Sequence, residues 1–218
     1  MFGALLARLN ERRALNAYAL GDYPKAERLF LAMLAREGET ARVLRNLALT
    51  RMAQGDLEGA LARFAREAEL YGPTPDRLQA LADAAYLAGD RERAARRLAA
   101  ALAHPQCSAR ELCRRRAAVC AEPAAYARAM QGKQDFAAGN VRLAQKDVDG
   151  ALAAFRAAAA ADPTDFAALN NIGGILLNQK DDPAGAAQAF SQALALQELP
   201  MLKANLAMAR AKLDARRA

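Results

Sequence analysis

The chain has 218 residues, of which 54% are hydrophobic and 25% charged, and its formal net charge is +7. Leucine and alanine dominate the apolar residues, which favours helix because both lose little side-chain freedom there. No uninterrupted apolar run approaches the roughly 20 residues that span a bilayer, so we expect no transmembrane segment. The excess of arginine is moderate and spread along the chain, so it does not by itself indicate a nucleic-acid partner.

The N-terminal segment, residues 1–10, is mildly apolar but lacks a basic lead and is interrupted by Arg8. We therefore interpret it as the beginning of the first helix and not as a signal peptide. Three cysteines without the spacing of a disulfide framework indicate a reducing compartment, so the cytoplasm is expected. A periplasmic or membrane-associated location is the alternative if a signal or an anchor upstream of this chain has been removed.

The dipeptide Gly-Asp recurs every 34 residues, at Gly21-Asp22, Gly55-Asp56 and Gly89-Asp90. At fixed spacing after it stand an alanine and then a large apolar residue: Ala26 and Phe30, Ala60 and Phe64, Ala94 and Leu98. The pattern returns with Lys146-Asp147, Ala151 and Phe155, and with Asp181-Asp182, Ala186 and Phe190. It predicts helical hairpins in which glycine adopts the left-handed conformation and aspartate caps the next helix. The alanine allows two helices to approach closely, and the large residue fills the space between hairpins.

Other positions follow the same period. A small residue recurs on the first helix of each repeat, at Ala14, Ala48, Ala82, Gly139 and Gly173. At the boundaries between repeats, the expected helix caps are Thr40, Thr74 and Thr164. Residues 200–218 are expected to form a last helix whose apolar residues are Leu202, Leu206, Met208 and Leu213, and this helix would cover the end of the stack.

Taken together, these features resemble the tetratricopeptide repeat family from about Asn10 to Leu196. The resemblance implies an all-α, right-handed superhelical solenoid of antiparallel helix pairs, with a C-terminal capping helix and about a dozen helices in all. It also implies a non-enzymatic adaptor or scaffold that holds an extended peptide or a helix of a partner protein in a concave groove. Self-assembly is one alternative, and binding of an acidic partner or an anionic polymer is another.

The phase of the repeat slips between Gly89 and Lys146, which are 57 residues apart, one period plus 23 residues. We therefore expect a block of three repeats at residues 1–106, a non-consensus helical connector at 107–131, and a block of two repeats with the capping helix at 132–218. Within the connector, Ser108 and Glu111 form a capping-box pattern that predicts a helix reaching about Ala121. A further helix is expected to start at Pro123 and to continue into the fourth repeat.

The resemblance places the partner-binding surface on the first helix of each repeat, where asparagines commonly hold a peptide backbone. The matching residues are Arg42, Arg45, Asn46, Leu49, Gln79, Asn140, Asn170, Asn171 and Asn205. An amide side chain offers a donor and an acceptor, so it can pair with a peptide unit of any sequence. Asn140 and Asn171 match two positions of the family's carboxylate clamp for chaperone tails. The basic residues of that clamp are missing, since Phe136, Met201 and Asn205 stand in their places, so this ligand is not expected. Helix capping or simple exposure is the other interpretation of these asparagines.

A second candidate surface is rich in arginine. Its residues are Arg93, Arg96, Arg97, Arg114 and Arg115. Guanidinium groups suit phosphate and carboxylate, so an acidic partner or an anionic polymer is one interpretation. The other is a solvated helix face, because Asp90, Glu92 and Glu111 are interleaved with the arginines. Aromatic residues make up only 6% and tryptophan is absent, which leaves few stacking platforms for nucleic acid.

The single histidine and the three cysteines lie within 17 residues, at His104, Cys107, Cys113 and Cys120. Thiolates and imidazole bind zinc, but the spacing does not match the familiar close ligand pairs. Free cysteine is also a common buried residue, so we favour core packing and expect neither a metal nor a cofactor, with a redox role as the remaining alternative. A single histidine leaves little material for a nucleophile and its base, so no catalytic residue is predicted.

Overall fold

The structure is a computed structural model that describes residues 2–216, with the side chains of residues 9–216. In that range the chain forms twelve α-helices and no strand. It divides into two compact units, unit 1 (Met1–Ser108) and unit 2 (Ala109–Ala218). The predicted connector, residues 107–131, comprises the end of unit 1, the first helix of unit 2 and the beginning of its second helix.

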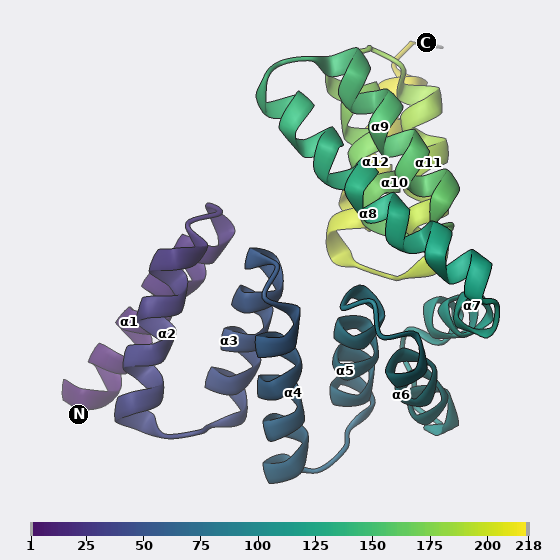
Figure 1. Ribbon diagram of the computed structural model, residues 1–218. Helices are drawn as coiled ribbons and strands as arrows, with labels where there is room; N and C mark the ends of the chain where they lie inside the picture. Colours follow the sequence, from purple (N-terminus) through teal and green to yellow (C-terminus); the bar gives the residue numbers. More distant parts are fainter. Residues whose placement is uncertain (1, 217–218) are drawn as a thin grey trace. The chain divides into compact units, whose positions relative to one another are not determined.

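Unit 1 consists of three helix pairs (Figure 1). They are α1 (Phe2–Ala19) with α2 (Tyr23–Glu37), α3 (Ala41–Gln54) with α4 (Leu57–Tyr71), and α5 (Pro75–Leu87) with α6 (Arg91–Ala103). Unit 2 begins with α7 (Arg110–Ala121) and continues with two pairs, α8 (Pro123–Ala144) with α9 (Val148–Ala161), and α10 (Phe166–Asn178) with α11 (Pro183–Leu196). The last helix is α12 (Pro200–Asp214). The helix expected to run unbroken from Pro123 into the fourth repeat is confirmed as α8.

The turns within the pairs have the predicted geometry. Gly21, Gly55 and Gly89 have φ angles of 77°, 84° and 85°, in the left-handed region. The following aspartates are the N-caps of α2, α4 and α6, and the Asp90 carboxylate accepts a hydrogen bond from the Arg93 amide at 2.8 Å. In unit 2 the same position is held by Lys146 and Asp181, whose φ angles are 63° and 53°. The turn therefore keeps its conformation where glycine is absent.

Thr40 and Thr74 cap α3 and α5 as predicted, but Thr164 does not cap α10. The N-cap of α10 is Asp165, whose carboxylate accepts a hydrogen bond from the Ala168 amide at 2.9 Å. Thr164 is fully buried, and its hydroxyl donates to the Asp162 carboxylate at 2.6 Å. The threonine is used inside the core, so the next residue takes the capping role.

The capping box predicted at Ser108 is also wrong. Helix α7 begins at Arg110, with Ala109 as its N-cap and without a side-chain cap. Ala109 is 4% exposed and packs in a small core cluster with Leu112 and Leu196. Burial of Ala109 fixes the start of the helix one residue later than the box requires, and the exposed Ser108 hydroxyl lies 3.5 Å from the Gln79 side chain instead.

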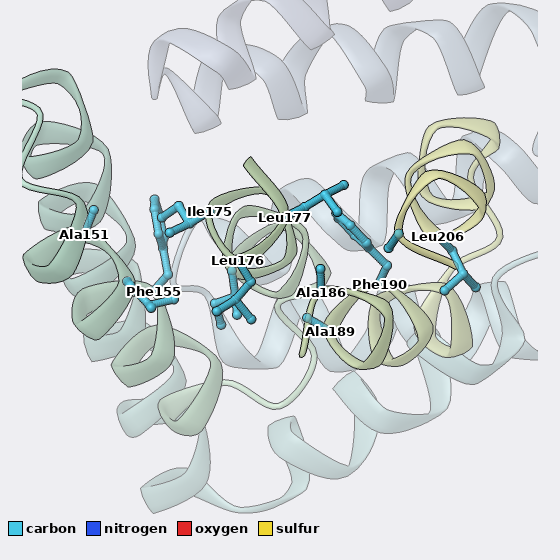
Figure 2. Close-up of a cluster of buried hydrophobic side chains, with 12 residues drawn as sticks. Ala151, Phe155, Ile175, Leu176, Leu177, Ala186, Ala189, Phe190 and Leu206 are labelled. Atoms are coloured by element: carbon cyan, nitrogen blue, oxygen red, sulfur yellow. The ribbon is translucent and has the colours of Figure 1, made fainter. Parts of the chain in front are cut away.

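The core of each pair is built from the predicted small and large residues. All five recurring alanines are 0% exposed, and the large residues that follow them are at most 1% exposed: Phe30, Phe64, Leu98, Phe155 and Phe190. Figure 2 shows Phe155 and Phe190 in the core of unit 2. A Cβ atom added to Gly139 would lie 2.7 Å from the Phe155 ring, and one added to Gly173 would lie 2.6 Å from the Phe190 ring. The glycines therefore allow the close approach that the pattern predicted.

Helix α12 packs against α11 and covers the last core cluster, as expected for the terminal helix. Its buried residues are Leu202, Leu206 and Ala209, which share one face at helical spacing. Leu213 is half-buried, but Met208 is 56% exposed, so it does not belong to the packed face.

Candidate functional site

In unit 1, the first-helix residues Arg42 and Arg45 line a pocket of about 250 Å³ between the first turns of α3 and α5. The other lining residues are Ala41, Glu67, Thr74, Asp76 and Arg77. Asn46 and Leu49 are half-buried further along α3, outside the pocket lining. Gln79 lies on α5, where its side-chain oxygen is 3.5 Å from the Ser108 hydroxyl. The structure thus gathers two of the five candidate residues of unit 1 into one pocket.

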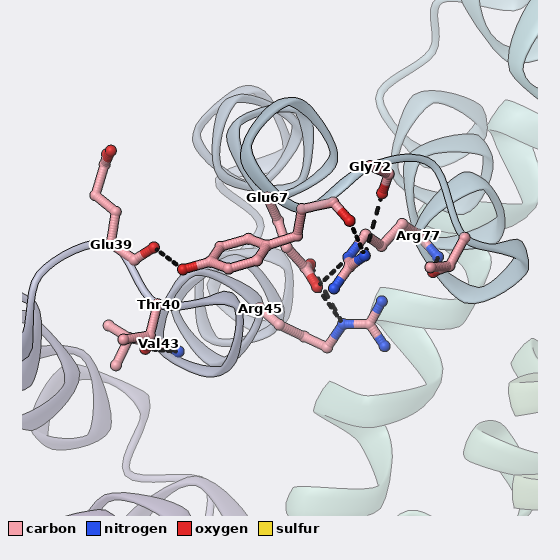
Figure 3. A network of polar contacts seen from close by, with 9 residues as sticks. Glu39, Thr40, Val43, Arg45, Glu67, Gly72 and Arg77 are labelled. Carbon is pink, nitrogen blue, oxygen red and sulfur yellow. Dashed lines mark hydrogen bonds and ion pairs between the residues drawn. The ribbon is translucent and has the colours of Figure 1, made fainter.

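The base of this pocket is a buried carboxylate held by two arginines (Figure 3). Glu67 is 2% exposed, and its carboxylate accepts from Arg45 Nε at 3.3 Å and from Arg77 Nε at 3.0 Å. Arg77 also donates to the backbone oxygens of Tyr71 and Gly72, at 2.8 and 3.1 Å. Its guanidinium lies 5.6 Å from the centre of the Tyr71 ring. A buried charge needs such partners, because desolvation without them is costly.

Arg45 has two terminal nitrogens with hydrogen-bonding capacity left for a ligand. It uses Nε for Glu67, and no hydrogen bond of its two terminal nitrogens to the described residues is found. Its side chain is 33% exposed. Arg42, by contrast, is paired with Glu11 and Glu37. Because the pocket also lies at the N-terminal ends of α3 and α5, the local potential favours an anion, although Asp76 opposes it.

In unit 2, the structure joins two of the four candidate asparagines. Asn205 on α12 donates to the side-chain oxygen of Asn170 on α10 at 2.9 Å. Asn140 is exposed on α8, and Asn171 is half-buried on α10. No hydrogen bond joins Asn140 or Asn171 to that pair in the part of the chain that the structure describes. The Asn170–Asn205 pair still has one amide hydrogen-bonding group on each side chain for a ligand.

Most of the arginine-rich set is engaged in ion pairs. In unit 1, Arg93 is paired with Glu58 and Asp90, and Arg96 lies 3.8 Å from Glu92. Arg97 is half-buried on the same helix. In unit 2, Arg114 and Arg115 both pair with Glu111 and hold the pKa of that carboxyl below its usual range. These pairs reduce the net charge that the arginines present to an anionic ligand.

The cysteines are buried and free of disulfides, and His104 ends α6, where its Nδ1 accepts from the Gln106 amide at 3.2 Å. Among the described residues, no cluster of histidine, cysteine and carboxylate side chains has an arrangement that would hold a metal ion. Across residues 2–216, no helix combines the length and apolar character needed to cross a membrane.

Five of the seven residues that line the pocket were not among the predicted site residues, and three of the five are charged: Glu67, Asp76 and Arg77. The sequence pattern could have indicated Glu67. Glu67 occupies the register of Met33 and Ala101 in the neighbouring repeats, where the chain otherwise carries a buried apolar residue. A carboxylate in an apolar register predicts buried cationic partners.

A family model described as tetratricopeptide repeat matches residues 11–76 and 136–200, together more than half of the chain. No curated protein sequence matches this chain. Among solved structures, the APC/C hetero-tetramer Cut9-Hcn1 is 16% identical, with 93% of this chain and 42% of that chain covered and a TM-score of 0.50. TTC0263, a thermophilic TPR protein in Thermus thermophilus, is 21% identical, with 93% and 98% covered and a TM-score of 0.41. MamA from Desulfovibrio magneticus RS-1 is 16% identical, with 87% and 94% covered and a TM-score of 0.42. At such identities the similarity concerns the fold alone, and the expected all-α solenoid of antiparallel helix pairs is confirmed.

Proposed function

Because the chain belongs to the tetratricopeptide repeat family, we propose that it is a non-enzymatic adaptor that binds an extended peptide or a helix of a partner protein. The proposed binding residues lie on the first helices α3 and α5 in unit 1, and on the first helices α8 and α10 and the terminal helix α12 in unit 2. The cytoplasm remains the predicted compartment, which the three free cysteines favour.

The observation that carries this proposal is the pocket at Arg45. A guanidinium with unused terminal nitrogens, held in place through Nε by the buried Glu67, is pre-organised for a carboxylate. The bound carboxylate is an acidic side chain or the C-terminus of the partner segment. Leu49, one helical turn further along α3, supplies an apolar contact beside this anchor.

In unit 2, the candidate asparagines hold the backbone of the partner segment. Asn140 and Asn171 each present a donor and an acceptor, which together match one peptide unit. The Asn170–Asn205 hydrogen bond fixes two further amides between α10 and α12. This arrangement on unit 2 binds backbone and is tolerant of the sequence of the bound segment.

Capture from a lysate of the source organism tests the proposal. The groove variant carries Arg45→Gln, Asn46→Ala, Asn140→Ala and Asn171→Ala. Glutamine at position 45 keeps a donor for Glu67 but removes the charge. Arg28→Glu, on the exposed face of α2, is the control, because it changes more charge outside the proposed surface. Circular dichroism and thermal unfolding confirm that all three proteins fold.

The proposal predicts a protein that the wild type and the control retain and the groove variant loses. Equal retention by all three proteins would contradict it. Capture of the chain itself, with a mass in solution that depends on concentration, would favour self-assembly. Salt-sensitive binding to heparin, without any captured protein, would favour an anionic polymer.

A further inference from the structure

Unit 2 carries a larger pocket, of about 490 Å³, on a different side of its helix pairs. The pocket lies between the second helices, α9 and α11, with α10 beneath them. Its floor is formed by Leu169, Ile172 and Leu176 of α10. Its walls are Arg156, Ala159 and Ala160 of α9, and Asp182, Gly185, Gln188, Ala189 and Gln192 at or on α11.

Small residues line this pocket at positions where α2 of unit 1 carries leucine. When the recurring alanines Ala26 and Ala151 are aligned, Ala159 falls in the register of Leu34 on α2. When Ala26 and Ala186 are aligned, Ala189 falls in the register of Leu29 on α2. Both leucines are half-buried in unit 1. The two alanines leave a hollow above the aliphatic floor of α10, in which Leu169 is half-buried and Ile172 and Leu176 are each 7% exposed.

The polar groups around the hollow are available to a ligand. Arg156, Gln188 and Gln192 are exposed, and none of their side chains takes part in a hydrogen bond or an ion pair with the described residues. Asp182 is already engaged as the N-cap of α11, where it accepts from the Gly185 amide at 2.9 Å. The pocket therefore combines an arginine available for an anion, two amides and an apolar floor.

We propose that this pocket is a second protein-binding site, which takes an extended segment with an acidic side chain next to a small aliphatic one. Arg156 binds the carboxylate, for which its planar fork is suited. Gln188 and Gln192, one helical turn apart, pair with the peptide units of the segment. The aliphatic side chain enters the hollow between Ala159 and Ala189 and packs on the half-buried Leu169 of the floor. The site is independent of the Arg45 anchor, since it uses other helices and other residues.

Selection of phage-displayed random linear peptides against the purified full chain tests this site. One variant fills the pocket with the residues that α2 carries in the same register, Ala159→Leu with Ala189→Leu. A second variant, Arg156→Gln, removes only the cation. Arg210→Gln, on the exposed face of α12, is the matched charge control, and Arg45→Gln reports on the groove.

We expect selected peptides with an aspartate or glutamate beside a small aliphatic residue. Their affinity should fall about tenfold or more on the filled variant and on Arg156→Gln, and stay unchanged on Arg210→Gln and Arg45→Gln. Changing the peptide acid to its amide should weaken binding to the wild type but cause little further loss on Arg156→Gln. If the filled variant does not fold, the comparison of the acid and amide peptides on the wild type and on Arg156→Gln tests the site by itself. Selection of no such peptide, or binding that is indifferent to Arg156, would overturn the site.

Discussion

At the scale of single residues, the two units form the same left-handed turn with different residues. Unit 1 places glycine in the left-handed turn position three times, whereas unit 2 places Lys146 and Asp181 there. A residue with a Cβ atom pays roughly 1–2 kcal/mol in this conformation. Asp181 offsets the strain with ion pairs to Lys212 and Arg216, but no such pair of Lys146 is found among the described residues.

Lys146→Gly should therefore raise the free energy of unfolding by about 0.5–1 kcal/mol, after the larger entropy of glycine in the unfolded chain is taken into account. Urea titration followed by circular dichroism measures the change. Asp181→Gly is the matched variant, and its gain should be smaller because two ion pairs are lost. A destabilised Lys146→Gly protein would show that the turn is not strained.

Glu67→Ala should lower the free energy of unfolding by about 3 kcal/mol, because it leaves Arg45 and Arg77 without the carboxylate that they share. Glu69→Ala, which removes an exposed carboxylate two residues away, should change it by less than about 1 kcal/mol. Thermal and urea unfolding compare the two variants. Equal effects would mean that the buried network does not stabilise unit 1.

The carboxyl of Asp165 should make the stability of the protein depend on pH. Burial raises the pKa of this carboxyl above its ordinary value of 3.8, and the charge of Asp162 raises the pKa further. The folded protein thus binds this proton more tightly than the unfolded chain does. The contribution of Asp165 to stability therefore falls as the pH rises from the ordinary pKa of the carboxyl toward its raised pKa. Asp165→Asn keeps a capping oxygen and does not titrate.

We therefore expect the stability of Asp165→Asn relative to the wild type to increase as the pH rises above the ordinary aspartate value of 3.8. Urea unfolding at several pH values gives this difference directly. A difference that stays constant with pH would contradict the raised pKa.

At the scale of helices, two adjacent glycines of α10 differ in their surroundings, so their substitution distinguishes the effect of packing from that of helix propensity. Gly173 faces the Phe190 ring, whereas a Cβ atom at Gly174 would meet nothing within 4 Å. Gly174→Ala should stabilise the protein by about 0.5–1 kcal/mol, because alanine is the better helix former. Gly173→Ala makes the same gain but crowds a buried ring, which costs about 1–3 kcal/mol, so a net loss is expected. Chemical denaturation of both variants checks the prediction, and equal stability would refute the close approach.

Helix order and turn geometry were predictable from the sequence because they depend on local patterns. The Gly-Asp turns place a permissive residue before a capping one, and the alanine and phenylalanine positions repeat the period of the hairpin. The starts of α7 and α10 were not predictable, because they depend on tertiary burial. Ala109 and Thr164 are drawn into the core, and this decides which neighbouring residue begins each helix.

At the scale of the whole molecule, the chain presents a candidate surface in each of its two compact units. The period identified the helices that carry the candidate residues, because the first helix of each hairpin can be read from the repeat. It did not reveal which of these residues are already used inside the protein. Arg42 is neutralised by two glutamates, and Asn170 and Asn205 bind each other. Only the folded structure distinguishes such residues from Arg45, whose terminal nitrogens have capacity for a ligand.

The most direct test of the central proposal is site-specific photo-crosslinking in the lysate of the source organism. A photoreactive phenylalanine analogue replaces Leu49 on α3 in one protein and Leu31 on the exposed face of α2 in another. The proposal predicts a crosslinked partner protein from position 49, lost when Arg45→Gln is added, and no such adduct from position 31. Adducts from position 31 alone, or none from position 49, would contradict binding on the first helices.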